Sequence, residues 1–170
     1  MSGAVADAEK ALEAARAVGE VQSLNYTLTM CTHVFALASE EQRALELAHE
    51  LLGSVKQGNL MQFAVINLPA FAQAAVRLSL GEQLLDALAS QPKSRWTEAV
   101  EAYVAGDYLT AADILAQAGT RVDEAEARLR AAEQLAAAGN RAEADEQRGL
   151  AAAFYRSVGA TRYLEEAEAV

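Results

Sequence analysis

Alanine-rich segments with helical periodicity, separated by short turns that contain glycine, constrain the fold of this 170-residue chain more than any other feature. In the segment 44–55, apolar side chains recur at three- and four-residue intervals, while Glu46 and Glu50 lie on the other side. Alanine is the best helix former, and the sequence has two prolines, Pro69 and Pro92, to interrupt its helices. The pattern predicts an all-α fold.

Short turns set how these helices pack. A glycine ends a helix in the left-handed conformation, and connections of a few residues make consecutive helices antiparallel neighbours. We therefore expect one α-solenoid of antiparallel helix pairs, a single helical-repeat domain over residues 1–170 with a looser joint at 90–94. The predicted helices span residues 4–18, 20–38, 40–56, 59–80, 81–90, 94–105, 107–118, 121–138, 140–157 and 160–169.

The spacing of the turn glycines indicates the type of repeat. Gly19 and Gly53 are 34 residues apart, and Gly106 and Gly139 are 33 apart, which is typical of tetratricopeptide-like two-helix repeats. Such a unit places small residues 12 and 19 positions after the glycine and an aromatic residue 16 after it, so that paired helices approach closely. The corresponding residues are Cys31, Phe35 and Ala38 after Gly19, and Ala151, Tyr155 and Val158 after Gly139.

Residues 96–170 carry a more specific pattern. It includes Ala105-Gly106-Asp107-Tyr108, Ala138-Gly139 and the closing run Ala153-Phe154-Tyr155-Arg156. This pattern resembles the C-terminal helical-repeat region of large bacterial, often actinobacterial, signalling proteins. Those are cyclase-like or transcription-regulator-like chains with an ATPase module before the repeats, and residues 8–56 look like their preceding repeats. The resemblance implies a sensing or scaffolding role within a longer protein, or in a standalone relative of one.

Charge and composition exclude several classes of function. The formal net charge is −10 and no basic stripe is present, so we expect no direct binding of nucleic acid. Residues 57–76 carry no charge, but glutamines, asparagines and Pro69 interrupt them, and this favours a buried helix over a membrane span. The first residues lack the basic and apolar segments of a signal peptide, and Cys31 has no second cysteine to pair with. We expect a cytoplasmic protein.

No local motif for catalysis appears in the sequence. It lacks a Gly-x-x-x-x-Gly-Lys-Ser/Thr loop for nucleotide phosphates and a Gly-x-Ser-x-Gly nucleophile elbow. Cys31 and His33 are two residues apart and face different sides of a helix, which does not suit a metal. We therefore expect no cofactor, no metal and no enzymatic activity.

Neutral polar residues within apolar helices form the candidate site. Repeat solenoids often bind a partner along a concave surface with amides and hydroxyls that hydrogen-bond to its backbone. The alternative is that these groups form hydrogen bonds between helices. The predicted partner-binding residues are Asn25, Thr29, Thr32, His33, Gln62 and Gln73.

Three functions remain open at this point. The first is a regulatory module that binds a protein or peptide. The second is self-association, in which the apolar stretch 60–76 forms a homodimer seam. The third is a small-molecule sensor with a pocket lined by Met30, Phe63 and Phe71.

Overall fold

The computed structural model describes residues 2–58 and 65–170, and among these it contains helices and no strand. This confirms the all-α class. The described chain forms two compact units, residues 1–100 and 101–170, with helix α6 (Arg95–Val104) running across the division. The single repeat domain and the solenoid of antiparallel pairs stay predictions.

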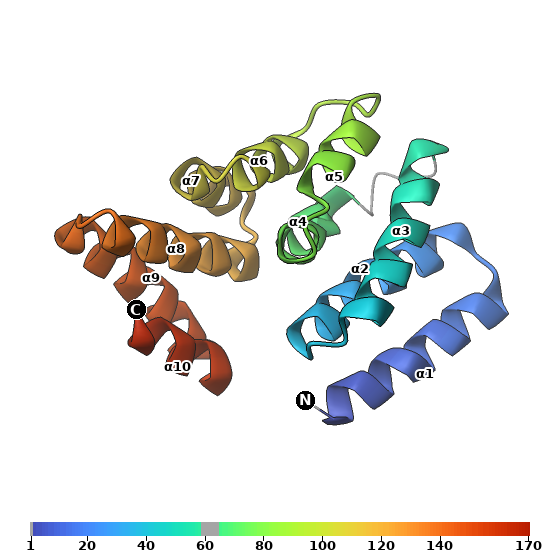
Figure 1. The fold of residues 1–170 in the computed structure, drawn as a ribbon, viewed down its shortest axis with the longest axis horizontal. Coiled ribbons are helices and arrows are strands. Elements are labelled where there is room, and N and C mark those ends of the chain that lie inside the picture. The colour runs from blue at the N-terminus through green and yellow to red at the C-terminus, as the bar shows by residue number, and fades with distance from the viewer. Residues whose placement is uncertain (1, 59–64) are drawn as a thin grey trace. The chain divides into compact units, whose positions relative to one another are not determined.

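The first unit is arranged around helix α2 (Figure 1). Helix α2 packs against α1, α3 and α4, and α5 packs against α3 and α4. Its core is built from large apolar side chains, of which Leu28, Phe35 and Phe71 are fully buried. The elements are α1 (Ser2–Val18), α2 (Val21–Leu37), α3 (Glu41–Lys56), the 3₁₀ segment η1 (Val65–Asn67), α4 (Leu68–Arg77) and α5 (Gly81–Leu88).

The second unit is a series of helices in which each packs against the next. Helix α8 contacts α7 and α9, and α9 also contacts α10. Buried alanines and Leu129 fill the space between α8 and α9, and Tyr155 closes the core beneath α10. The helices are α7 (Tyr108–Ala118), α8 (Arg121–Ala137), α9 (Arg141–Val158) and α10 (Thr161–Ala169).

The fourth helix differs most from its predicted span of 59–80. Residues 59–64 lie outside the described part of the chain. Val65–Asn67 forms the 3₁₀ segment, and the α-helix begins at Leu68 with Pro69 in its first turn. Proline is favoured there, because the first turn of a helix does not use the missing N–H group.

The positions of the turn residues contradict the predicted repeat period in the first unit. Gly53 is not a turn residue but lies within α3, and the left-handed residue after that helix is Gly58, 39 positions from Gly19. Serine replaces glycine at two turns, Ser39 (φ 62°) and Ser79 (φ 59°), which are 40 positions apart. The 34-residue spacing was therefore not a spacing of turns, although Gly106 and Gly139 both have positive φ.

These serines close their helices with the same hydrogen bonds as a glycine does. The N–H of Ser39 donates to Ala36 O and that of Glu40 to Phe35 O. After α8, the N–H of Gly139 likewise donates to Ala136 O and that of Asn140 to Leu135 O. A side chain in this conformation costs about 1 kcal/mol, because its Cβ crowds the carbonyl oxygen.

We predict that Ser39→Gly and Ser79→Gly each raise the free energy of unfolding by about 0.5–1 kcal/mol, since relief of this crowding exceeds the added freedom of the unfolded chain. Gly139→Ala is the matched control. A Cβ at Gly139 would meet no atom within 4 Å, so its cost comes from the backbone alone, and we expect a loss of about 1 kcal/mol. Urea denaturation measures all three. Destabilisation by both serine replacements would contradict the assignment.

Candidate interaction surfaces

The predicted polar set lies mostly inside the first unit. Asn25 is 1% exposed and Thr32 is fully buried, while Thr29 and Gln73 are also buried. The Thr29 hydroxyl donates to the carbonyl oxygen of Asn25 at 2.9 Å, so its polarity is satisfied within the helix. The partner groove predicted along these side chains is wrong for the four, because a partner cannot reach them. Gln62 lies outside the described residues.

Of the described members of the set, His33 is the one that is half-buried and not fully enclosed. Burial lowers the pKa of its imidazole, the positive charge of Arg77 lowers it further, and a hydrogen bond with the backbone of Ala70 acts in the opposite direction. The Nδ1 atom is buried and has no hydrogen-bond partner among the described residues. The lowered pKa favours a neutral imidazole near pH 7.

The outer side of α2 carries large side chains that the prediction from sequence did not group together, although it placed His33 in the partner-binding set and Met30 in a small-molecule pocket. Tyr26 is 52% exposed and Met30 is 37% exposed, while His33 and Leu37 are half-buried. These four residues are spaced by four, three and four positions, so they line one side of the helix, and we call them the α2 stripe. No residue of α2 is an Asp, Glu, Lys or Arg. The spacing was visible in the sequence and is the signal that would have located this surface.

Neither alternative site appears as predicted. Phe71 is fully buried in the core, Met30 is on the surface, and Phe63 lies outside the described residues. In the stretch 60–76, residues 60–64 are likewise outside the described part. The remainder supplies core residues of the first unit, among them Leu68 and Phe71, so this part does not form an exposed homodimer seam.

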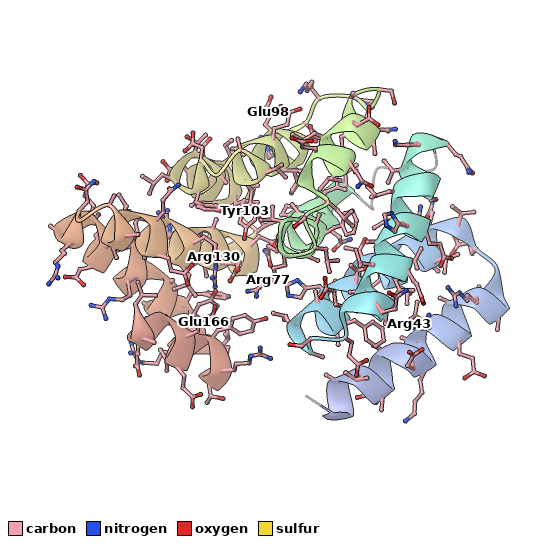
Figure 2. All side chains as sticks on the ribbon, in the orientation of Figure 1. Arg43, Arg77, Glu98, Tyr103, Arg130 and Glu166 are labelled. Atoms are coloured by element: carbon pink, nitrogen blue, oxygen red, sulfur yellow. The ribbon has the colours of Figure 1, made fainter. Side chains whose placement is uncertain are left out.

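In the second unit, a cluster of charges joins α8 to α10. The guanidinium of Arg130 forms ion pairs with Glu126 at 3.0 Å and with Glu133 at 2.8 Å, and it also pairs with Glu166 of α10 (Figure 2). Burial opposes the charge on Arg130, but these carboxylates outweigh it and raise the pKa of the guanidinium. Glu126 and Glu133 lie on α8 with Arg130, so the pair with Glu166 is the one that ties α10 to α8. Glu166 is 36 residues from Arg130, so no local pattern could predict the pair.

Tyr155 lies beneath this cluster in the core of the second unit. Its ring stacks on Tyr163 of α10 at 5.2 Å between centroids. The hydroxyl is buried and has no hydrogen-bond partner among the described residues. Burial raises the pKa of this hydroxyl, and the negative charge of Glu126 raises it further.

Cys31, the single cysteine of the sequence, lies in the interior of the first unit. The Cys31 thiol is buried and donates to the carbonyl oxygen of Ala8, and burial raises its pKa, with the charge of Glu9 adding to the effect. The described residues contain no group of three or more His, Cys, Asp or Glu side chains placed to hold a metal ion. None of the described helices combines the length and apolarity needed to cross a membrane.

A depression of about 620 Å³ lies along a single segment of the first unit, residues 39–46. Its walls are mainly charged, and Arg43 in this segment is held by Glu9 at 3.0 Å and Glu46 at 3.2 Å (Figure 2). Glu40 and Glu41 add two further carboxylates. Leu45 is the apolar side chain among the described residues that line this depression.

Comparison with known proteins identifies no relative, because no protein-family model, curated protein or solved structure matches the chain. The resemblance to bacterial regulatory repeats therefore stays a prediction.

The pH dependence of stability tests the buried position of the Tyr155 hydroxyl in the second unit. Because its pKa is raised above the ordinary value of 10, the folded state holds this proton more tightly than the unfolded state does. Its contribution to stability is present below pH 10 and is lost as the pH rises further. We expect Tyr155→Phe to change the free energy of unfolding by less than about 1 kcal/mol at pH 7, since no hydrogen bond is lost, and to reduce the loss above pH 10.

Thermal unfolding from pH 7 to pH 11 measures this difference. Tyr26→Phe is the control, because the Tyr26 side chain is exposed. Equal alkaline loss in wild type and Tyr155→Phe would contradict the buried, unpartnered position of the hydroxyl.

Proposed function

We propose that this chain is a non-catalytic protein-interaction module and that the α2 stripe docks an apolar segment of another protein. The resemblance to bacterial signalling and transcription-regulatory repeats supports a regulatory role for that contact. The observation that carries the proposal is the exposure of Tyr26 and Met30 on a helix without formal charges.

The chemistry of the stripe favours protein binding. Tyrosine supplies a large contact area with few rotatable bonds, and methionine adapts its shape to different apolar surfaces. Both residue types are enriched in protein interfaces. An uncharged helix face also avoids the cost of removing water from charged groups during binding.

The size of the stripe favours a short partner segment over a second copy of the chain. A stable dimer buries about 800 Å² on each partner, which takes some 20–30 residues a side. The four residues of the stripe lie on one 17-residue helix. An amphipathic helix that lays three or four apolar side chains along α2 fits this surface.

Charge favours a basic partner. Residues 1–100 carry 11 acidic and 7 basic residues, and residues 101–170 carry 13 and 7, so both units are acidic. This field speeds the approach of a cationic segment and slows that of an acidic one, and salt weakens both effects. We therefore propose a partner helix with an apolar side flanked by lysine or arginine.

We expect an 18-residue model helix with a leucine face and lysines elsewhere to bind the full chain and to shift the ε-methyl resonance of Met30 in a saturable way. Met30→Glu should weaken binding at least tenfold by calorimetry. The carboxylate that Met30→Glu introduces would attract the lysines of the model helix and so favour binding. A loss of affinity would therefore come from the lost apolar contact of Met30. Leu150→Glu on α9 is the matched control and should bind within twofold of wild type, because Leu150 is also exposed but lies outside the stripe.

Equal weakening by the two substitutions would refute docking on the stripe. Sedimentation equilibrium tests whether a second copy of the chain covers the stripe instead. A doubled mass that Met30→Glu returns to the monomer value would mean that a second copy covers the stripe.

A further inference from the structure

The first unit contains a cavity of about 370 Å³ at the connection between α5 and α6. Pro92, Lys93 and Trp96 contribute to its wall, together with Val65. Cavities that bind small molecules range from about 300 to 1,000 Å³, so this one fits a compact ligand.

The connection that forms the wall is anchored at both ends. The side-chain amide of Gln91 donates to the carbonyl oxygen of Val55 in the last turn of α3, at 3.3 Å. At the start of α6, the backbone N–H of Ser94 donates to the Thr97 hydroxyl at 2.9 Å, and the N–H of Thr97 donates to the Ser94 hydroxyl at 3.3 Å. These bonds fix both ends of the segment 91–97, and the looser joint predicted at 90–94 stays a prediction. A preformed wall lowers the entropic cost of binding.

The wall has an apolar part. Trp96, Pro92 and Val65 present an indole ring, a pyrrolidine ring and a branched aliphatic side chain. The indole Nε1 atom is buried and has no hydrogen-bond partner among the described residues. An aromatic or aliphatic ligand body suits this composition, because flat rings stack on indole and exclude water from it.

The wall also has a cationic part in an otherwise acidic chain. Among the described residues that line the cavity, Lys93 is the one that carries a charge, and Glu98 lies in the first turn of α6 but does not line the cavity. Lys93 lines the cavity, and the first turn of α6 directs its positive dipole end to the same region. These charges favour an anionic group at one end of a ligand.

We propose that this cavity binds a small organic anion, with an apolar or aromatic body against Trp96 and Pro92 and its carboxylate or sulfonate near Lys93. The cavity and the α2 stripe share no residue, so this proposal is independent of the proposed docking of a protein. It gives the module a second ligand of a different chemical class.

Two probes that differ in one anionic group test the assignment. 8-Anilinonaphthalene-1-sulfonate carries the sulfonate, and N-phenyl-1-naphthylamine is the same ring system without it. Trp96 is the single tryptophan of the chain, so its fluorescence reports binding at the cavity wall. We expect both probes to quench Trp96 in a saturable way, with the sulfonate bound more tightly.

Lys93→Gln should raise the dissociation constant of the sulfonate at least fivefold and change that of the neutral probe less than twofold. Lys10→Gln is the matched control, since Lys10 is an exposed lysine on α1, and it should leave both constants unchanged. Met30→Glu should also leave both unchanged, which separates this site from the stripe. Equal effects of Lys93→Gln on the two probes, loss of binding in Met30→Glu, or no quenching of Trp96 would each overturn the proposal.

Discussion

A left-handed residue closes eight of the ten described α-helices, and the rest of the structure depends on these turns. Gly19, Ser39, Gly58 and Ser79 follow one another at intervals of 19 to 21 positions in the first unit. Gly19, Ser39 and Ser79 let the chain reverse within a few residues, so α1 meets α2, α2 meets α3, and α4 meets α5 along their sides. Helices of 8–18 residues are marginal in water by themselves, and packing against neighbours stabilises them. Alanine permits this packing, because its small side chain lets helices approach closely while it keeps the highest helix propensity.

Helix α2 shows how packing determines a surface. It has three helical neighbours, and a charged side chain on any of the packed sides would have to leave water. Small polar residues such as Thr29 are tolerated there, because a hydroxyl can bond to the carbonyl oxygen four residues earlier. The side that remains open carries Tyr26 and Met30. The packed sides lack charge because of this cost, whereas the open side could carry a charge and does not, and this is why the α2 stripe is a candidate contact surface.

The sequence predicted most helix ends to within two residues, because periodicity and turn glycines are local signals. It could not show that Ser39 and Ser79 take the place of glycine, since serine adopts that conformation only when the surrounding packing imposes it. The side of α2 that faces the core was assigned wrongly, because amides and hydroxyls suit both a core with satisfied hydrogen bonds and a wet groove. The contacts between Arg130 and Glu166, and between Gln91 and Val55, join residues about 36 positions apart. Such pairs depend on tertiary packing, which leaves no local pattern.

The distribution of reactive groups bears on what the chain can do. Burial keeps the Cys31 thiol protonated by raising its pKa, and it lowers the pKa of the His33 imidazole, so the first loses its nucleophilic form and the second its charge. Arg130 is held by three carboxylates, which use its donors for structure. What the described surface offers instead is shape. On the proposals made above, the α2 stripe and the cavity beside Lys93 would each bind a molecule without changing it, as the proposed regulatory role requires.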